Sequence, residues 1–219
     1  TVKKPGVVTL VVDTSGSMAG EKLEQARDGV LRMLDNIDVA NRVGLLTFAD
    51  GLREYVAVAP VSENRFAVVE VAKRMRASGP TELYTALQSA VKMTDEAEAD
   101  PDATRGVVVL TDGRATGGVP LDRVVEVMSR DETRLQTCAV FQTMDTCFGP
   151  NGEEVPKKDV LGTAMAIKTK HPIHIFYVGI GDDADLEVGR ILAEATHSAY
   201  RATTADTLAA VLEKFGKYF

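Results

Sequence analysis

The run Asp13-Thr14-Ser15-Gly16-Ser17-Met18 constrains the fold of this chain more than any other feature, because it stands where a buried strand is expected to end. The preceding residues 7–12 form a short, β-branched and nearly continuous apolar run, which is typical of a strand covered on both faces. Asp13, Ser15 and Ser17 then place three hard oxygen donors on one tight turn. Such donors suit Mg²⁺, Mn²⁺ or Ca²⁺ rather than zinc.

Two further segments strengthen this prediction. The loop at residues 79–83 is expected to open a helix that runs to about residue 97, and Thr81 lies at its start, where a hydroxyl commonly caps backbone N–H groups. Residues 107–110 predict another buried strand, which leads through a Thr-Asp-Gly turn to a second carboxylate, Asp112. Asp13 and Asp112 therefore both follow apolar strands, at the edge of an α/β sheet where ligands bind.

Together these segments resemble the von Willebrand factor type A family, also called the integrin I-domain-like family. Its metal-ion-dependent adhesion site combines Asp-x-Ser-x-Ser, a Thr in a Gly-rich loop and an Asp in a Thr-Asp-Gly turn. All five positions occur here in the same order, as Asp13, Ser15, Ser17, Thr81 and Asp112. The resemblance covers nearly the whole chain. It implies a divalent cation held by the three hydroxyls, with the two carboxylates acting directly or through water.

The same chemistry can be argued from the residues. Two carboxylates balance the charge of a divalent cation, whereas the hydroxyls add no charge. Such a cation keeps residual Lewis acidity, so a carboxylate from a partner protein could fill an open coordination position. The affinity for the metal alone is expected to be modest, about 10⁻⁴–10⁻³ M.

Apolar patterns of strand and helix type alternate along the chain, which predicts an α/β fold. We expect a doubly wound, mostly parallel six-stranded sheet flanked by helices, the Rossmann-like fold of the family that the chain resembles. The expected strands are 7–12, 43–48, 52–58, 107–110, 174–181 and 199–202, of which 52–58 is an antiparallel edge. The expected helices are 22–37, 65–75, 81–97, 121–128, 185–195 and 207–215. In the second of these, Phe66, Val69, Ala72 and Met75 share one face.

The length of 219 residues predicts one domain, 1–219, which is large enough to bury a core. The chain starts at Thr1 and moves directly into a strand, so we expect it to be excised from a longer protein. Residues 131–170 form an insertion that is longer than an α/β connection needs. Within it we expect a strand at 135–141, a turn at 150–152 and a helix at 164–170. Two interpretations of the insertion stay open: it determines partner specificity, or it is a surface segment that only packs against the rest of the protein.

Composition limits the partners and the compartment. A net charge of −7 and a pI near 5.1 argue against nucleic acid as a partner. No stretch approaches 18 consecutive apolar residues, so we expect no membrane insertion by this segment. Cys138 and Cys147 could be free thiols or could close a disulfide loop, which would add about 2–3 kcal/mol. We favour the cell surface, where adhesive members of the family work, with the cytoplasm as the alternative.

Catalysis is not expected. Phosphoryl-transfer enzymes of the haloacid dehalogenase type carry a second Asp two residues after the first, and Ser15 stands there instead. A nucleophilic serine needs a positioned base, usually a histidine. None of the three histidines sits at the end of a motif strand: His171, His174 and His197.

The sequence therefore predicts a divalent-cation-dependent protein-binding module, with a role in adhesion or interaction. A partner would present Asp or Glu to the metal, Mg²⁺ or a similar cation. The alternative, taken from intracellular members of the family, is a subunit that works with an AAA+ ATPase in metal insertion or complex remodelling. The resemblance also implies that the last helix, at residues 207–215, moves when a ligand binds.

Overall fold

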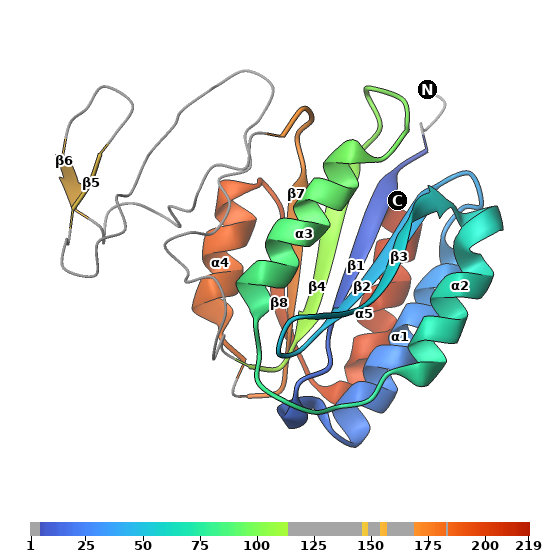
Figure 1. Cartoon of the computed structure of the whole chain (residues 1–219), viewed down its shortest axis with the longest axis horizontal. Coiled ribbons are helices and arrows are strands. Elements are labelled where there is room, and N and C mark those ends of the chain that lie inside the picture. The colour runs from blue at the N-terminus through green and yellow to red at the C-terminus, as the bar shows by residue number, and fades with distance from the viewer. Residues whose placement is uncertain (1–4, 114–145, 149–153, 157–168, 183) are drawn as a thin grey trace.

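The computed structural model describes residues 5–113, 146–148, 154–156, 169–182 and 184–219 of the chain (Figure 1). The strands are β1 (Val7–Asp13), β2 (Arg42–Phe48), β3 (Leu52–Pro60), β4 (Arg105–Thr111), β5 (Thr146–Phe148), β6 (Glu154–Pro156), β7 (His174–Ile180) and β8 (Tyr200–Thr203). The helices are the 3₁₀ turn η1 (Gly16–Met18), α1 (Glu21–Asn36), α2 (Val61–Arg74), α3 (Leu83–Glu96), α4 (Leu186–Ala195) and α5 (Ala205–Tyr218).

Six strands form one sheet in the order β3-β2-β1-β4-β7-β8. All neighbours are parallel except β2 and β3, so β3 is the antiparallel edge that the sequence predicts. The doubly wound fold class is thereby confirmed. β1 lies between β2 and β4, and its register pairs Val12 with Leu110. Because the two strands are parallel, their carboxyl ends meet at one edge of the sheet.

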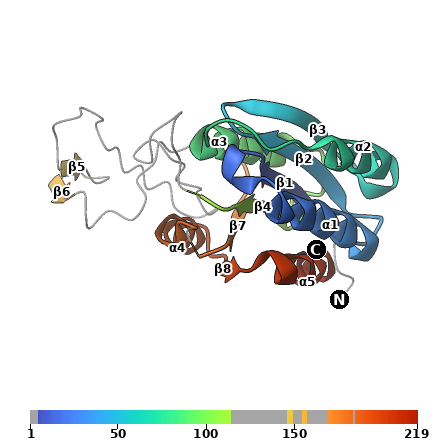
Figure 2. The same cartoon turned by 90° about the horizontal axis from the view of Figure 1, so that it is seen from below.

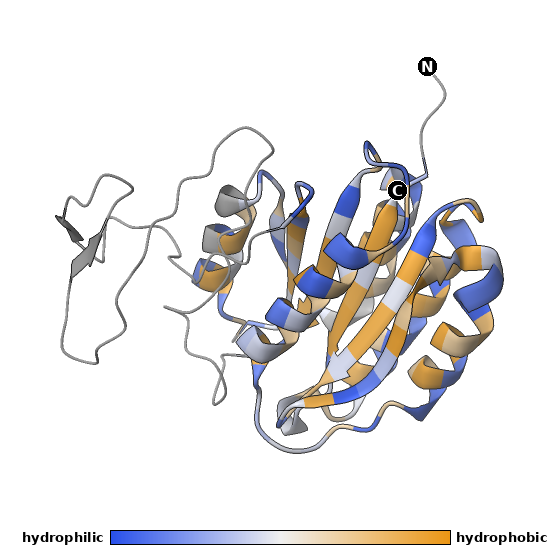
Figure 3. Cartoon of the chain, turned by 45° about the horizontal axis from the view of Figure 1, so that its top comes forward, coloured by the Kyte–Doolittle hydropathy of each residue, from blue (hydrophilic) through white to orange (hydrophobic). Residues whose placement is uncertain are grey.

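Helices cover both faces of this sheet (Figure 2). Side chains of α1, α2 and α5 share one apolar cluster with one sheet face, and α3 and α4 contribute to a second cluster on the other face. Apolar residues consequently line the central strands, whereas polar residues gather on the outer surfaces of the helices (Figure 3). β1 and β4 are buried along their whole length, which explains their continuous apolar sequence.

The starts of α2 and α3 differ from the expected boundaries, and α5 extends beyond the expected range 207–215 at both ends. α2 begins at Val61, directly after Pro60, four residues before the expected start. Its buried face contains Val68 and Ala72, while Phe66, expected on the apolar face, is 77% exposed. α3 begins at Leu83 with Glu82 at the N-cap position, so the expected helix start at Thr81 is wrong by two residues.

Most of the predicted insertion lies outside the described residues, as does the expected helix at 121–128. Within the insertion at residues 131–170, β5 and β6 pair antiparallel and form a separate two-stranded sheet. Cys138 and the expected elements at 135–141 and 150–152 fall outside the described residues, so free thiols and a disulfide both stay predictions. Of the expected helix at 164–170, only residues 169 and 170 are described, and these are not helical. None of the described helices combines the length and the apolar character needed to cross a membrane.

α5 packs closely along α1, and a glycine permits the close approach (Figure 2). A Cβ atom built on Gly216 would lie 2.8 Å from the backbone oxygen of Met33 and 3.3 Å from the Cβ of Asn36. Because the nearest obstacle is backbone, a larger residue at position 216 must move a whole helix.

We expect Gly216→Ala to destabilise the protein by about 1–3 kcal/mol, as in other overpacked sites. Helix propensity alone would stabilise the variant by about 0.5–1 kcal/mol, so the sign of the change tests the contact. Urea unfolding followed by circular dichroism measures it. As a control, Ala210→Gly on the exposed side of α5 should follow propensity and cost about 1 kcal/mol. A stabilised Gly216→Ala variant would show that α1 and α5 lie farther apart.

Candidate metal centre

Asp13 is the last residue of β1 and is fully buried. Its Oδ1 accepts a hydrogen bond from the backbone N–H of Ser15 at 2.7 Å, and its Oδ2 accepts one from Thr111 Oγ1 at 2.6 Å. Burial raises the pKa of this carboxyl, and the hydrogen bonds from Thr111 and Ser15 oppose that shift. Asp13 is therefore a rigidly held carboxylate in a site where negative charge is poorly solvated.

A chain of hydrogen bonds joins three more of the predicted ligands. The Oγ atoms of Ser15 and Ser17 lie 3.1 Å apart, and Ser17 Oγ donates to Asp112 Oδ1 at 2.7 Å. The second bond spans 95 residues of sequence and joins the loop after β1 to the turn after β4. Asp112 is fully buried and Ser15 is nearly so, whereas Ser17 is exposed. These oxygens thus form a partly open cluster at the carboxyl edge of the sheet.

Thr81 reaches this edge in a loop that is bonded to the loop after β1. Gly16 N–H donates to the Gly79 oxygen at 2.9 Å, and Ser78 N–H donates to the Thr14 oxygen at 2.9 Å. Thr81 itself is 4% exposed. The structure therefore joins the segments of all five predicted ligands. Side-chain hydrogen bonds connect Ser15, Ser17 and Asp112. The Asp13 carboxylate accepts the Ser15 backbone N–H, and Thr81 belongs to the bonded loop.

Arg53, on β3, braces the loop that carries Thr81. Its guanidinium donates to the backbone oxygen of Ser78 at 3.0 Å and to Asp50 Oδ1 at 3.0 Å. Gly79 adopts a φ of +79° in this loop, and a Cβ there would approach Arg53 Nη2 to 3.2 Å. Glycine is thus favoured by the backbone conformation, and a side chain there would also press on the Arg53 guanidinium.

The donor set fits a hard divalent cation. No group of three or more His, Cys, Asp or Glu residues that could hold a metal occurs in the described part of the chain. A metal at this edge would therefore need the hydroxyls of Ser15, Ser17 and Thr81 beside the two carboxylates. Oxygen ligands of this kind suit Mg²⁺, Mn²⁺ or Ca²⁺ and would not favour zinc.

Sequence reasoning missed two residues of the cluster. Thr111 orients Asp13, and the ammonium group of Lys22 lies 2.6 Å from Asp112 Oδ2. The signal for Thr111 was its place at the carboxyl end of β4, beside Asp112. Lys22 lies in the first turn of α1, directly after the loop that bears Ser15 and Ser17, but its approach to Asp112 depends on the folded path of that loop.

Two buried tyrosines lie near the carboxylates. Burial raises the pKa of Tyr84 to about 12, and Asp185 adds to this effect. Burial also raises the pKa of Tyr177, with smaller contributions from Asp185, Tyr84, Asp13 and Asp112. The Tyr177 hydroxyl has no hydrogen-bond partner within the described structure. Both phenols therefore stay neutral and add no negative charge to the site.

All three histidines lie at the other edge of the sheet. His174 is the first residue of β7, and its Nδ1 lies 2.8 Å from the backbone oxygen of Thr196. His171 precedes the same strand and contacts Asp95, on the last turn of α3, at 3.0 Å. His197 precedes β8. No histidine is therefore placed to activate Ser15 or Ser17.

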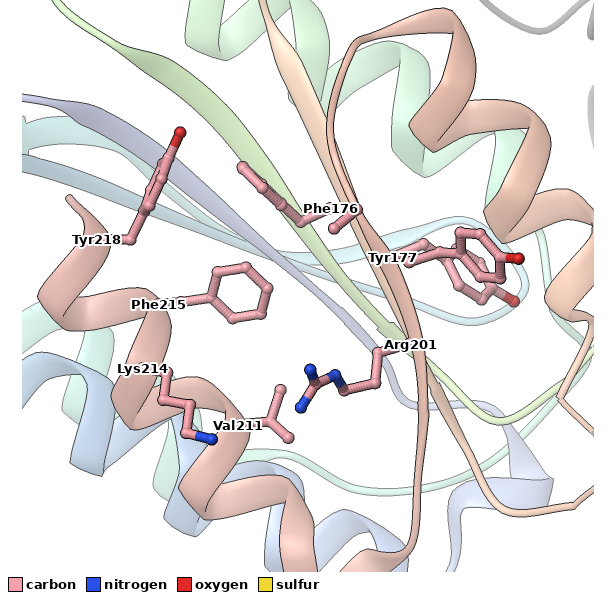
Figure 4. A pocket seen from close by; sticks show the side chains of 9 residues that line it. Phe176, Tyr177, Arg201, Val211, Lys214, Phe215 and Tyr218 are labelled. Carbon is pink, nitrogen blue, oxygen red and sulfur yellow. The ribbon is translucent and has the colours of Figure 1, made fainter.

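A hollow of about 280 Å³ lies elsewhere, between α5 and strands β7 and β8 (Figure 4). Phe176, Phe215 and Tyr218 form its apolar wall, while Arg201 and Lys214 lie at its other side (Figure 4). None of the five predicted metal ligands lines it.

The structure describes one position of α5, so the movement of this helix stays a prediction.

Comparison with known proteins finds one matching family model and a set of similar proteins. Residues 8–114 match the family model of the von Willebrand factor type A domain, a range that contains all five predicted ligands. Inter alpha-trypsin inhibitor, heavy chain 4, of Mus musculus is 32% identical over 117 residues, which are 51% of this chain and 12% of that protein. Heavy chain H3 of the Homo sapiens inhibitor is 31% identical over 121 residues, 52% of this chain and 14% of that protein. The chain thus spans only about an eighth of these relatives.

Solved structures share the fold over nearly the whole chain. A von Willebrand factor type A protein from Catenulispora acidiphila aligns with a TM-score of 0.67 and 19% identity, covering 98% of this chain and 42% of that one. The pilus adhesin SpaC from Lactobacillus rhamnosus GG aligns with a TM-score of 0.64 and 18% identity, covering all of this chain and 31% of that one. At such identities the likeness concerns the fold alone.

Proposed function

Because residues 8–114 of this chain match the family model of the von Willebrand factor type A domain, we propose that the protein is an interaction module whose binding depends on a divalent cation. The proposed cation is Mg²⁺ or a similar ion at the carboxyl edge of the sheet. Its ligands are Asp13, Ser15, Ser17, Thr81 and Asp112. The partner is a protein that presents the carboxylate of an Asp or Glu side chain.

One observation carries the proposal: the hydrogen bond of 2.7 Å from Ser17 to Asp112, which brings the first and last parts of the motif into one cluster. Backbone hydrogen bonds also tie the loop after β1 to the loop that carries Thr81 and to β2, including Thr14 N–H to the Phe48 oxygen at 2.8 Å. Hydroxyl and carboxylate oxygens are thereby held in place before any ligand arrives, which lowers the entropic cost of binding.

The residues have distinct roles in this proposal. Asp13 and Asp112 supply the negative charge, and Thr111 and the Ser15 N–H fix the orientation of Asp13. When bound, the cation supplies a coordination position that a partner's carboxylate oxygen can fill. Exposed Ser17 marks the side of the cluster that solvent and a partner can reach.

Binding rather than catalysis is supported by the placement of possible bases. The three histidines lie at the opposite edge of the sheet, so neither serine has a histidine base there. A solved structure that shares the fold, from Lactobacillus rhamnosus GG, is described as a pilus adhesin.

Calorimetric titration of Mg²⁺ and Mn²⁺ into metal-stripped protein tests the site. We expect saturable binding of one ion per chain with a Kd of about 10⁻⁴–10⁻³ M. The absence of any heat and of any change in backbone amide signals at 20 mM metal would contradict the proposed site.

Glutarate, a minimal mimic of an acidic side chain, tests the role of a partner's carboxylate. In an amide NMR spectrum, glutarate should shift the signals of Ser15 and Gly113 when Mg²⁺ is present and leave them unchanged in EDTA. Glutaramide, which has the same carbon skeleton without charge, is the control and should shift neither. Equal shifts in Mg²⁺ and in EDTA would contradict carboxylate binding through a cation.

A further inference from the structure

Lys22 places a positive charge inside the proposed metal site. It is the second residue of α1, which begins shortly after the loop that carries Ser15 and Ser17. Its Nζ lies 2.6 Å from Asp112 Oδ2, and 27% of its side chain is exposed, against none of that of Asp112. A partly exposed lysine side chain thus places its ammonium group against a carboxylate that is shielded from water.

The two carboxylates of the site are neutralised differently. Asp13 accepts hydrogen bonds from neutral groups, the Ser15 N–H and the Thr111 hydroxyl. Asp112 accepts a neutral hydrogen bond from Ser17 at Oδ1 and the charged one from Lys22 at Oδ2. A buried carboxylate without a cation is costly, so the ammonium group stabilises Asp112 while no metal is bound.

A divalent cation and an ammonium group cannot share this place without repulsion, because like charges a few ångströms apart disfavour each other strongly at low solvent exposure. A cation that uses Asp112 must therefore compete with Lys22. The side chain of lysine is long enough to withdraw, since its stem is flexible and 27% of the side chain is exposed.

We propose that Lys22 is a built-in competitor of the divalent cation, which neutralises Asp112 in the metal-free protein and leaves it when the cation binds. This inference rests on the proposed function. Its consequence is that Lys22 lowers the affinity for the metal while it stabilises the metal-free fold. A partner's carboxylate would then be needed to complete tight binding.

The test compares Lys22→Met with Lys73→Met. The first variant removes the charge and keeps an unbranched side chain of similar length. The second removes the same charge from α2, where Lys73 forms an exposed pair with Glu70, and so controls for the net charge of the protein. Lys22→Arg keeps the charge at the site and should stay within threefold of the unaltered protein in metal affinity.

In calorimetry with Mg²⁺ and Mn²⁺, we expect Lys22→Met to bind the metal about tenfold more tightly than the unaltered protein, and Lys73→Met to bind it equally. In EDTA, Lys22→Met should unfold at a lower temperature than Lys73→Met. Added Mg²⁺ should raise its midpoint more than that of the control, because tighter binding to the folded state gives a larger shift.

Equal or weaker metal binding by Lys22→Met would overturn this inference and leave the proposed metal site standing, since Lys22 would then support Asp112 rather than compete for it. No metal binding by either protein would overturn both. If Lys22→Met does not fold in EDTA, an NMR titration of the unaltered protein tests the competition instead. Its Lys22 Cε signal, identified by its loss in Lys22→Arg, must shift on titration with Mg²⁺, and an unchanged signal at saturating metal would overturn the competition.

Discussion

Replacing Asp13 by asparagine is expected to weaken binding of Mg²⁺ by at least about 100-fold, which corresponds to about 2.7 kcal/mol. Asparagine has the shape of aspartate but lacks its charge, so one of the two buried carboxylates of the site is lost. The attraction between a carboxylate and a divalent cation is large where water is scarce. Titration calorimetry of metal-stripped protein measures the change.

The same variant should remain folded without metal. Burial raises the pKa of Asp13, which means that the ionised carboxylate is held there at a cost. Asparagine removes this cost, and its side-chain oxygen can still accept the Ser15 N–H. We therefore expect Asp13→Asn in EDTA to be at least as stable as the unaltered protein. Loss of metal binding with a retained fold would separate the site from the scaffold.

Asp50→Asn is the matched control for this experiment. Asp50 follows β2 at the same edge of the sheet and carries the same charge, but its side chain is 61% exposed and pairs with Arg53. Its replacement should leave the affinity for Mg²⁺ within about threefold, because the amide oxygen of asparagine can still accept a hydrogen bond from the Arg53 guanidinium that braces the Thr81 loop. If Asp13→Asn and Asp50→Asn weakened binding equally, the effect would come from net charge and the assignment of Asp13 as a ligand would be wrong.

Asp95→Ala is expected to lower the free energy of unfolding by about 3 kcal/mol, the range found when a buried, multiply bonded carboxylate is removed. Asp95 accepts the backbone N–H of Lys170 at 2.9 Å and that of His171 at 3.0 Å. The His171 ring also lies 3.0 Å from Asp95 Oδ1. Alanine would leave these donors unpaired where the chain enters β7.

Arg105 should increase the loss of stability in Asp95→Ala. This arginine is buried, and its guanidinium donates to the backbone oxygens of Thr94 at 2.5 Å and Ala97 at 3.1 Å, at the end of α3. Burial lowers the pKa of Arg105, and the charge of Asp95 opposes that shift. Removing Asp95 would leave a buried cation without its neighbouring anion.

Urea unfolding followed by circular dichroism measures this effect, with Glu96→Ala as the control. Glu96 is the next residue of α3, is largely exposed and lies 4.0 Å from Lys92, so its loss should change stability by no more than about 0.5 kcal/mol. Asp95→Ala should also bind Mg²⁺ normally, because Asp95 lies at the sheet edge opposite the metal site. Equal stability of the two variants would contradict the anchoring role of Asp95.

The comparison of α2 and β1 shows where sequence patterns are sufficient. β1 and β4 are buried on both faces, so their central residues are almost all apolar and the run is easily recognised as a strand. α2 has apolar residues on more than one side. Their spacing is compatible with a buried face that contains Phe66, but in the structure the Phe66 side chain is exposed to solvent. Its start after Pro60 was missed because β3 runs into the helix without an intervening loop.

Thr81 shows a similar limit at the site. A Thr after Gly-Pro suggests a helix cap, but Glu82 takes the N-cap position of α3 and its N–H donates to the Ala49 oxygen at 2.7 Å. The loop is thus held by a contact with the segment after β2. Such a bond depends on how two distant parts of the chain meet, which local sequence does not encode.

By itself, the sequence determined the types of the main elements and the oxygen-bearing residues at the ends of β1 and β4, because periodicity and turn chemistry act over a few residues. The tertiary structure decided which of these ends meet. The strand order places β4 beside β1, so that Thr111 reaches Asp13 and Ser17 reaches Asp112. Contacts between residues nearly a hundred positions apart arise from the packing of the whole sheet. The approach of Lys22 to Asp112 likewise exists only once that sheet has formed.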